Sequence, residues 1–440
     1  MIILIDVIVA RVRTGWLLTL MVFFGVISNA AEIPDLVLPA GVGVNIHFSR
    51  GHERDLDMIA AAGFKFIRMD FLWSEIERER GTYDWSAYDE LTANLDRRGL
   101  RAYYILDYSN PLDEETVVAK DPISGKEHPV QASPQHLESV AAFARWAAAA
   151  AKHFQGRHII WEIWNEPNGF FWEPKPDVQQ YTALALATAK AVRAADPQAT
   201  IFAPATSGFP WPFLDSFLKS GVLEFLDGVS VHPYRPPGRS PETAAEDFKK
   251  LRALIGTNAP PMRKKSIPII SGEWGYSSNV KGVSLETQAG FIVRQQLSNL
   301  WNGVPVSIWY DWKNDGADPN ENEHNFGTVS PELIPKPAYT AMKTLTRELA
   351  GFGIGSRYPT ASPNDFILVL TNAAGETRLA AWTMVEPHPV TLPLQPAPPK
   401  EISVVESEGQ ESKIENQAGH FALPLGSAPR YVLLGQAHLN

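Results

Sequence analysis

Two glutamates that lie 107 positions apart have the residue type and the setting to do chemistry in this chain. Glu166 closes the stretch His158–Pro167 (HIIWEIWNEP), and Glu273 lies in the stretch Gly272–Gly275 (GEWG). Each follows a short apolar run rich in β-branched and aromatic residues, which is typical of a buried strand. A lone glutamate of this kind is more often a helix cap or a loop acid. Two facing carboxyl groups, one protonated and one ionised, are what cleavage of a glycosidic bond requires.

Other polar and aromatic side chains fall at the expected carboxyl ends of the same set of strands. They are His47, Arg68, Asp70, Asp107, Tyr108, Asn165, His232, Tyr234, Trp274, Tyr310, Asp311 and Trp312. The strand bodies consist mainly of Ile, Val, Leu and Phe. Because the active sites of parallel barrels form at the carboxyl ends of their strands, this contrast indicates a site at that end.

Several of these neighbours suit the two glutamates chemically. Arg68 beside Glu273 would keep that carboxylate ionised, whereas the apolar neighbours of Glu166 would favour its protonated form. Asn165 could donate its amide hydrogen to a sugar 2-hydroxyl, a contact that strengthens in the transition state. His232 and Tyr234 could orient the two acids through hydrogen bonds.

A metal site is the rival use of such a cluster. The chain has no cysteine, which excludes thiolate zinc sites, disulfides and a cysteine nucleophile together. No HxxxH or HxH pair occurs on one expected element, and His47 and His232 fall on remote strands. We therefore expect neither a metal nor another cofactor.

Strand-like and helix-like stretches alternate along most of the chain. The predicted strands are Gly43–Phe48, Phe64–Phe71, Leu100–Asp107, His158–Glu166, Thr200–Pro204, Gly228–His232, Ile267–Glu273 and Val304–Tyr310. The predicted helices are Asp84–Arg98, Pro134–Phe154, Asp177–Ala195, Pro241–Ile255, Leu285–Trp301 and Pro337–Leu349. Eight β-then-α units over about 300 residues predict an α/β fold, the (β/α)8 TIM barrel. A doubly wound open sheet is the alternative, but Gly41-Val42-Gly43 precedes a strand and does not follow one.

The pattern changes near residue 350 to short strand-like runs separated by turns. These runs are Phe366–Thr371, Arg378–Thr383, Val390–Leu394, Glu401–Glu406, His420–Leu423 and Tyr431–Leu434. They predict a small C-terminal β-sandwich packed on the barrel. A sugar-binding module with Trp382 and Tyr431 as exposed platforms is one interpretation, and a stabilising domain without a site is the preferred one. The expected organisation is an N-terminal segment over 1–31, the barrel over 32–350 and the sandwich over 351–440.

The N-terminal segment has the pattern of a signal peptide or a membrane anchor. Arg11 and Arg13 precede the apolar run Trp16–Ile27, and Ser28-Asn29-Ala30 offers a small-x-small cleavage site. The run is shorter than the roughly 20 residues that a spanning helix needs. We therefore expect an exported protein, periplasmic or secreted, which could stay loosely associated with the inner membrane through this segment.

The amino-acid composition limits the classes of partner that the protein is expected to bind. The 440 residues carry a net charge of −10 without a basic block, which argues against a nucleic-acid partner. The 13 tryptophans offer flat apolar surfaces with a polar edge, which suit sugar rings as well as a core. A saccharide substrate and a monomeric state are expected.

Two motifs carry a resemblance to a known group of enzymes. Trp164-Asn165-Glu166-Pro167 and Gly272–Gly275 resemble the acid/base and nucleophile motifs of the clan A glycoside hydrolases. Within that clan the chain is similar to family 39, and most of all to hydrolases encoded with exopolysaccharide biosynthesis machinery. The likeness extends over the stretches 67–71, 76–77, 81–85, 105–108, 231–234 and 309–312, and so over the whole barrel.

This resemblance implies a retaining mechanism with Glu166 as acid/base and Glu273 as nucleophile. It also implies that further residues bind the substrate, with a tryptophan as the floor under the sugar; these are Arg68, Asn165, His232, Tyr234, His47, Asp107 and Trp312 or Trp274. We expect an endo-acting hydrolase of β-glycosidic bonds in an exopolysaccharide of the biofilm-matrix type, containing mannose or glucose. An exo-acting β-xylosidase or a plant-polysaccharide mannanase or glucanase is one alternative, and a sugar-binding barrel without catalysis is another.

Overall fold

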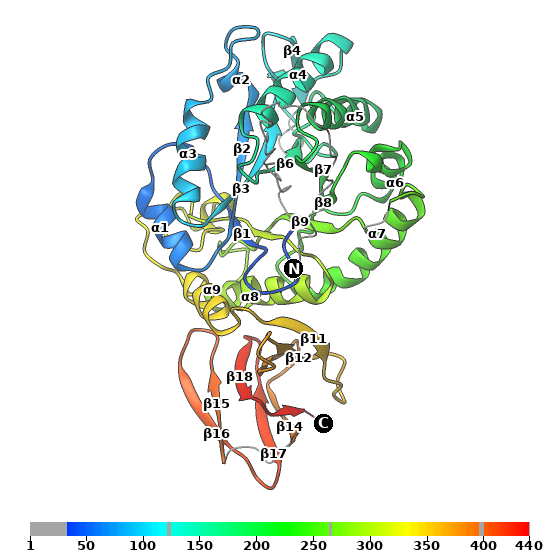
Figure 1. Ribbon diagram of the computed structural model, residues 1–440. Helices are drawn as coiled ribbons and strands as arrows, with labels where there is room; N and C mark the ends of the chain where they lie inside the picture. Colours follow the sequence, from blue (N-terminus) through cyan, green and yellow to red (C-terminus); the bar gives the residue numbers. More distant parts are fainter. Residues whose placement is uncertain (1–32, 121–124, 264–265, 396–399, 440) are drawn as a thin grey trace, which may run out of the picture.

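The centre of the protein is a closed barrel of eight parallel strands, seen in a computed structural model that describes residues 33–120, 125–263, 266–395 and 400–439 (Figure 1). The strands are β1 (Val42–Asn45), β2 (Phe66–Leu72), β3 (Arg101–Asp107), β6 (Ile160–Ile163), β7 (Thr200–Ser207), β8 (Gly228–His232), β9 (Ile269–Trp274) and β10 (Ser307–Trp309). Their order around the barrel is β1-β10-β9-β8-β7-β6-β3-β2. Each overlaps a predicted strand, so the predicted TIM barrel is confirmed.

Helices between the strands cover the outside of the barrel. They are α1 (Glu53–Ala61), α2 (Trp73–Ile76), α3 (Ser86–Asp96), α4 (Leu137–His153), α5 (Val178–Ala195), α6 (Trp211–Lys219), α7 (Ala245–Asn258), α8 (Leu285–Trp301) and α9 (Pro337–Glu348), with 3-10 turns η1 (Val222–Glu224), η2 (Pro241–Ala244) and η3 (Glu323–Asn325). The prediction missed α1, α2 and α6. These are short helices of nine, four and nine residues, and over such lengths a helical period is poorly defined.

Side chains alternate between the inside and the outside of the barrel. A small inner cluster consists of Phe66, Tyr103, Ile160, Phe202, Ile270, Val306 and Ile308, and a larger outer core lies between strands and helices. Gly43 of β1 has no room for a side chain, since a Cβ atom there would lie 2.3 Å from Ile308 and 2.8 Å from Phe66. The barrel interior is therefore a packed core, and its chemistry must take place at the mouth.

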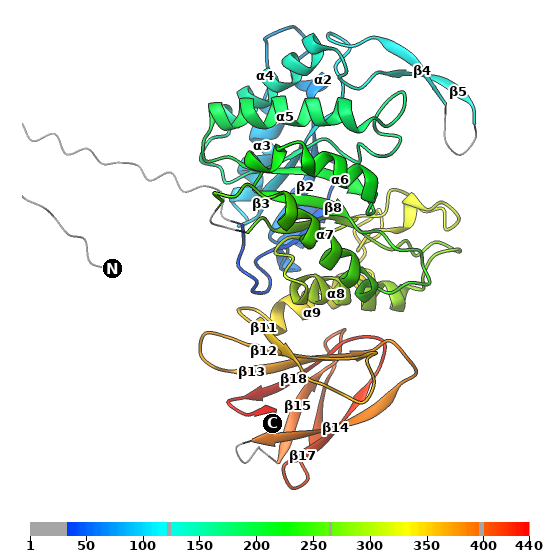
Figure 2. The ribbon, with the colours of Figure 1, turned by 90° about the vertical axis from the view of Figure 1, so that its right-hand side faces the viewer.

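The stretch from Asp113 to Pro134, to which the sequence assigned no role, contains a two-stranded antiparallel hairpin. Its strands are β4 (Thr116–Lys120) and β5 (Glu127–Gln131), and they project away from the barrel (Figure 2). They follow β3 and therefore start from the carboxyl end of the barrel.

The C-terminal part consists of strands and lies against one side of the barrel (Figures 1 and 2). One sheet has the order β11-β12-β13-β18-β15-β16 and the other β17-β14-β19. The bounds are β11 (Gly353–Arg357), β12 (Asp365–Thr371), β13 (Thr377–Thr383), β14 (His388–Gln395), β15 (Glu401–Val405), β16 (Glu411–Glu415), β17 (His420–Leu425), β18 (Arg430–Gly435) and β19 (His438–Leu439). A separate apolar cluster fills the space between the two sheets, as in a β-sandwich.

The contact between barrel and sandwich is built around a buried ion pair. Arg294 of α8 donates two hydrogen bonds of 2.7 Å to the carboxylate of Glu242 and one of 3.1 Å to the carbonyl oxygen of Ser427. Trp382 of β13 donates from Nε1 to the same carboxylate at 2.8 Å. Because Trp382 and Tyr431 are both fully buried, the interpretation of these two residues as exposed sugar platforms is wrong. Trp382 anchors the sandwich to the barrel.

The predicted N-terminal segment over 1–31 lies outside the described residues. Among the helices of the described residues, none is both long enough and apolar enough to pass through a membrane.

Candidate active site

The two glutamates meet at the carboxyl end of the barrel. Glu273 lies in β9, whereas Glu166 lies in the loop three residues beyond the end of β6 and does not end that strand as predicted. The backbone N–H of Glu166 donates to the carbonyl of Ala205 in β7, which fixes this loop against the neighbouring strand. One carboxyl oxygen of Glu166 lies within 4.8 Å of one of Glu273, and the two side chains are 12% and 14% exposed.

Arg68 of β2 lies beneath both acids and links the groups around them. Its guanidinium donates to Glu273 Oε2 at 2.6 Å, to Glu162 Oε2 at 2.9 Å and to Asn165 Oδ1 at 2.8 Å. Burial would lower its pKa, but the charges of Glu162 and Glu273 raise it well above its ordinary value. The prediction that Arg68 lies beside Glu273 is confirmed geometrically.

Glu162 is a member of the site that the sequence reasoning missed. It is fully buried in the middle of β6, where Oε2 is paired with Arg68 and Oε1 accepts a hydrogen bond of 2.5 Å from the Tyr103 hydroxyl. Gly272 makes room for it, because a Cβ atom there would lie 3.0 Å from Glu162 Oε1 and 2.4 Å from Ser230 Oγ. A charged residue inside a buried strand was the available signal, since such a charge must be paired.

His232 connects Glu166 to the same network. Its Nδ1 lies 2.8 Å from Glu166 Oε1, and its Nε2 lies 3.3 Å from Arg68 Nη2. A guanidinium can only donate, so Nε2 acts as the acceptor and the hydrogen resides on Nδ1, which donates to Glu166. This tautomer is inferred from the two partners.

Tyr234 and Asn165 complete the contacts of the two acids. The Tyr234 hydroxyl donates to Glu273 Oε1 at 2.8 Å, and burial, followed by the charge of Glu273, raises the pKa of Tyr234 well above its usual range. Asn165 Nδ2 donates to the Tyr108 hydroxyl at 3.1 Å. An amide nitrogen carries two hydrogens, and the second one has no acceptor within the described part of the chain, so it suits a ligand hydroxyl.

The predicted tryptophan floor is wrong. Trp274 and Trp312 are 0% and 1% exposed. Trp274 follows Glu273 directly in β9, so the alternation of the strand turns it away from the mouth. Trp312 donates from Nε1 to Asp55 of α1 at 2.9 Å and packs against Tyr339 of α9.

Tyr310 is the aromatic side chain that the structure presents at this end of β10. It is partly exposed and lies edge-on to His47, with ring centroids 5.6 Å apart. Its pKa is raised above its usual range by burial and by the charges of Asp311 and Glu273. The sequence placed Tyr310 at a strand end but gave it no role, because residue type alone favoured the tryptophan two positions later.

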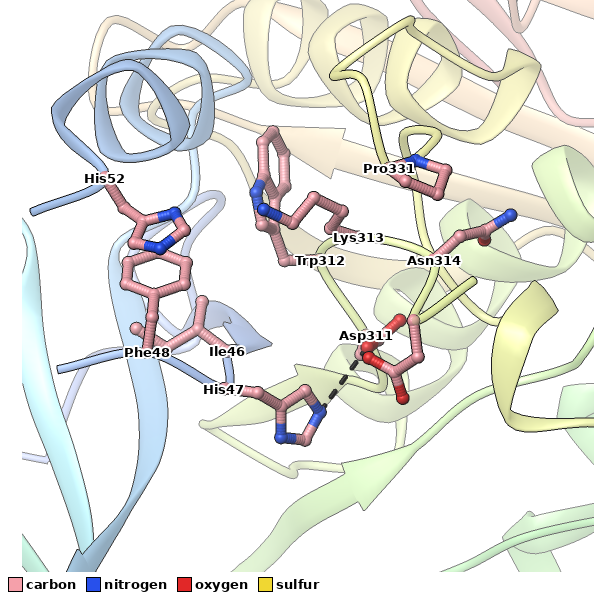
Figure 3. A pocket seen from close by; sticks show the side chains of 10 residues that line it. Ile46, His47, Phe48, His52, Asp311, Trp312, Lys313, Asn314 and Pro331 are labelled. Atoms are coloured by element: carbon pink, nitrogen blue, oxygen red, sulfur yellow. Dashed lines mark ion pairs between the residues drawn. The ribbon is translucent and has the colours of Figure 1, made fainter. Parts of the chain in front are cut away.

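His47 lines a pocket of about 260 Å³ between the segment after β1 and the segment after β10 (Figure 3). His47 and Asp311 point toward one another there, with Nε2 and Oδ2 3.5 Å apart (Figure 3). Burial would lower the pKa of His47, but the hydrogen bond and charge of Asp311 outweigh it and raise that pKa to about 9. Burial raises the pKa of Asp311 to about 7.

Asp107 does not lie where a substrate-binding residue is expected. It is the last residue of β3 and is fully buried. Burial, and then the charge of neighbouring Asp70, raise the pKa of Asp107 well above its ordinary value. Because no part of its side chain is exposed, the prediction that Asp107 binds substrate directly is wrong for this structure.

Three groups of acids and histidines among the described residues are close enough for metal ligation. Glu166, His232 and Glu273 form the first, His47, Asp311 and Asp315 the second, and Glu114, Glu115 and His136 the third, each with ligand atoms within 4.8 Å. In the first group the Arg68 guanidinium contacts both Glu273 and His232, so a positive charge already occupies the position where a cation would be attracted. The arrangement thus favours acid–base chemistry by the side chains.

With this geometry in place, comparison with known proteins places the chain. The family model described as "Cellulase (glycosyl hydrolase family 5)" matches residues 39–316, which is more than half of the chain. A β-xylosidase of Caldicellulosiruptor saccharolyticus is 26% identical over 243 residues, covering 49% of this chain and 48% of that protein. A β-xylosidase of Geobacillus stearothermophilus is 27% identical over 221 residues, covering 44% and 43%. The match thus spans about half the length of these curated relatives.

Solved structures share the fold over nearly the whole chain. A family 39 glycoside hydrolase from Bacteroides cellulosilyticus WH2 has a TM-score of 0.77 at 23% identity, covering 92% of this chain and 82% of that one. A family 39 β-xylosidase from Caulobacter crescentus has a TM-score of 0.64 at 20% identity, covering 90% and 95%. At such identities these likenesses speak for the fold, here a barrel together with its C-terminal β domain.

Proposed function

Because the chain belongs to the cellulase family of clan A glycoside hydrolases, the group described as glycosyl hydrolase family 5, we propose that it hydrolyses β-glycosidic bonds with retention of configuration. The observation that carries this proposal is the separation of the two acids, whose closest carboxyl oxygens lie within 4.8 Å. Retaining enzymes hold their carboxyl groups about 5–5.5 Å apart, whereas inverting enzymes need about 6.5–9.5 Å to admit a water molecule. Glu166 serves as acid/base and Glu273 as nucleophile.

In the first step a carboxylate oxygen of Glu273 attacks the anomeric carbon. The bond between that carbon and the glycosidic oxygen breaks, and Glu166 gives its proton to the departing oxygen. The hydrogen bonds from Arg68 and Tyr234 hold both oxygens of Glu273 in place for this attack. The product of this step is a covalent glycosyl-enzyme and a free leaving group.

In the second step water attacks the anomeric carbon and Glu273 leaves. Glu166, now ionised, accepts the proton of that water and is restored for the next cycle. His232 donates to Glu166 from Nδ1 in the inferred tautomer, which orients the carboxyl group in both steps. Arg68 and the buried Glu162 form a neutral background pair, so the site keeps its charge balance when Glu273 becomes an ester.

The substrate is a finer part of the proposal. We infer a family 39 type of enzyme acting within an exopolysaccharide, and the pocket of about 500 Å³ beside Tyr234 supports room for sugars beyond the cleaved bond. The relatives named β-xylosidase support an exo-acting β-xylosidase as the second candidate. The signal-like pattern over 1–31 supports a role in the periplasm or outside the cell.

One experiment tests both the activity and the mode of cleavage. The wild-type protein is incubated with exopolysaccharides, β-xylan and β-linked oligosaccharides, and the products are sized while NMR follows their anomeric configuration. Oligosaccharides of retained configuration would support the endo-acting proposal, and single xylose units would support the β-xylosidase. Initial products of inverted configuration would contradict the assignment of Glu273 as nucleophile. Binding without any hydrolysis would support a sugar-binding barrel.

A further inference from the structure

A pocket beside the Glu166 loop has no part in the steps described above. Its volume is about 290 Å³, and it lies between the segments that follow β3 and β6. Its lining consists of aromatic rings from both segments with polar groups at their edge, among them Tyr108, Trp164, Phe170, Phe171, Ser133 and Glu173. Both segments begin at carboxyl ends of barrel strands, so the pocket belongs to the mouth of the barrel.

The aromatic wall is fixed and is connected to the catalytic loop. The Phe171 ring stacks on Tyr108 with centroids 5.7 Å apart and planes 8° apart, and Trp164 donates from Nε1 to the carbonyl of Phe171 at 3.1 Å. The Tyr108 hydroxyl accepts a hydrogen bond of 3.1 Å from Asn165, the residue before Glu166. A ligand against this wall would therefore lie close to the acid/base.

The base of the β4–β5 hairpin closes the pocket from the other segment. The backbone N–H of Ser133 donates to the carbonyl of Glu173 at 3.0 Å, and the N–H of Glu173 donates to Ser133 Oγ at 2.8 Å. These two hydrogen bonds tie the hairpin segment to the end of the Glu166 loop. The pocket thus has a preformed shape, as small-molecule sites usually have.

Phe170 is left open to solvent at the edge of this pocket. Its side chain is 58% exposed, although its ring lies only 4.2 Å from that of Phe171. An exposed aromatic face beside hydroxyl, amide and carboxyl groups suits a sugar ring, which has an apolar face and polar edges. Gln131 and Ser109 supply further polar groups in the same lining.

We propose that this pocket binds the first sugar ring of the leaving group, with Phe170 as its stacking platform. The inference rests on the proposed function, because Glu166 must give its proton to the leaving oxygen and the leaving group therefore lies on the side of Glu166. Phe170 and Glu166 are four residues apart in one loop, and the N–H of Gly169 donates to the carbonyl of Glu166 at 2.9 Å to close the turn between them. The substrate class is a β-linked chain that continues past the cleaved bond.

Two kinds of substrate with the same glycone test this assignment. A β-glycosyl fluoride has no leaving sugar, whereas a β-linked oligosaccharide places one in the pocket. Phe170→Ala should lower kcat/KM for the oligosaccharide about tenfold, as expected for the loss of one stacked ring, and change that for the fluoride by less than about twofold. Phe170→Tyr should restore hydrolysis of the oligosaccharide. Trp301→Ala, at an aromatic side chain on α8 that is 39% exposed, is the matched control and should leave both substrates unchanged.

The outcomes separate this inference from the proposed function. Equal losses on fluoride and oligosaccharide in Phe170→Ala, or no loss on the oligosaccharide, would overturn the leaving-group pocket while the hydrolase activity stands. A wild type that releases neither fluoride nor sugar from any glycone of a panel of xylosyl, glucosyl, galactosyl and mannosyl substrates would overturn both. An added acceptor sugar could also occupy the pocket and speed turnover of the fluoride. If it does so in the wild type and not in Phe170→Ala, the result would support the leaving-group pocket.

Discussion

Two buried arginines of this protein have the same kind of partner and serve different ends. Arg68 in the barrel mouth and Arg294 at the contact with the sandwich are 1% and 3% exposed. Each contacts a glutamate, Glu273 at 2.6 Å and Glu242 at 2.7 Å. The chemistry of the two pairs is alike, so their surroundings must explain the difference.

The pair at the sandwich is closed on all sides. Both oxygens of Glu242 accept from Arg294, one of them also accepts from Trp382, and the carboxylate is 3% exposed. Burial would raise the pKa of Glu242, but the hydrogen bonds and charge of Arg294 lower it. Such a pair contributes to holding two parts of the protein together.

The pair at the mouth has a second acid behind it. Glu162 is fully buried and balances the charge of Arg68, so Glu273 can remain 14% exposed and face the opening. A buried arginine whose glutamate partner is also fully buried stabilises the contact between two parts of the protein. A buried arginine whose charge is balanced by a second acid can instead position a partly exposed, reactive carboxylate.

Replacing Glu273, the partly exposed partner of Arg68, should have the largest effect on catalysis. We expect Glu273→Gln to lower kcat/KM at least about 10⁴-fold, because the amide cannot form the glycosyl-enzyme. Arg68 keeps Glu162 as its partner, so thermal unfolding should shift by only a few degrees. Glu166→Gln is the companion variant and should recover partly with substrates whose leaving group needs no proton. A Glu273→Gln protein with ordinary turnover would refute the assignment of the nucleophile.

Replacing Glu242, the buried partner of Arg294, should lower the stability of the protein and leave catalysis unchanged. Glu242→Gln leaves Arg294 buried without a counter-charge, and we expect it to cost about 3–5 kcal/mol of unfolding free energy. The folded fraction should hydrolyse substrate at the wild-type rate. Urea unfolding followed by circular dichroism measures the loss, and the double variant Glu242→Leu with Arg294→Met should recover most of it. Unchanged stability in Glu242→Gln would show that the two arginines are not comparable.

Removing one hydrogen bond from the nucleophile should have an intermediate effect. Tyr234→Phe leaves Glu273 with Arg68 as its donor, and we expect kcat/KM to fall by about 10- to 100-fold, the equivalent of about 1.5–3 kcal/mol for a charged hydrogen bond. Tyr339→Phe removes a hydroxyl that donates to the carbonyl of Met58 in α1 and serves as the control. Equal kinetics for Tyr234→Phe and this control would mean that Arg68 alone holds Glu273.

The pair His47–Asp311 combines a partly exposed imidazole with a buried carboxyl group, and it should make the free energy of unfolding depend on pH. The pKa of His47 is raised from 6.5 to about 9, so its contribution to stability is complete below about pH 6.5 and is lost as pH rises to 9. We expect no more than about 1 kcal/mol, because the ring is 41% exposed and the charge is screened. Because the pKa of Asp311 is itself raised to about 7, the comparison stays above that value: unfolding at pH 7.5 and pH 9.5 should differ more in the wild type than in His47→Gln. The same difference in both proteins would place the titrating group elsewhere.

Removal of metal ions should leave the rate of hydrolysis unchanged. The charged guanidinium of Arg68 already contacts Glu273 and Glu162, so these carboxylates have a positive partner without a metal ion. Hydrolysis after dialysis against EDTA should equal that of the untreated protein. A loss of activity that added calcium, manganese or zinc restores would contradict this prediction.

Much of the fold followed from the sequence because the barrel strands are strongly patterned. Most residues of β2 and β3 are apolar or aromatic and buried, as expected for parallel strands covered on both faces. Short α1 and α6 lacked enough turns to show a period, and the β4–β5 hairpin has five-residue strands that are mostly exposed.

The residue types of the site could be predicted from the sequence, but the orientations of their side chains could not. Glu166, Glu273, Arg68, His232, Tyr234 and Asn165 were all named from their places at strand ends, and the structure brings them within hydrogen-bond distance of one another. Trp274, Trp312 and Asp107 were named by the same rule, but they are buried and share no hydrogen bond with these six residues. A strand end specifies height along the barrel, but inward or outward orientation depends on register and on the loop that follows.

The sequence by itself therefore determined that an alternating chain of strands and helices would present two glutamates and their polar partners at one end of a barrel. That follows from local pattern, because apolar periodicity and the positions of charged residues are properties of the chain. Only the tertiary structure decided that Glu162 balances Arg68, that Tyr310 is partly exposed after β10 whereas Trp312 is buried, and that Trp382 anchors the sandwich. These depend on which strands and domains become neighbours, since a buried charge and a buried indole each need a partner that is remote in the sequence.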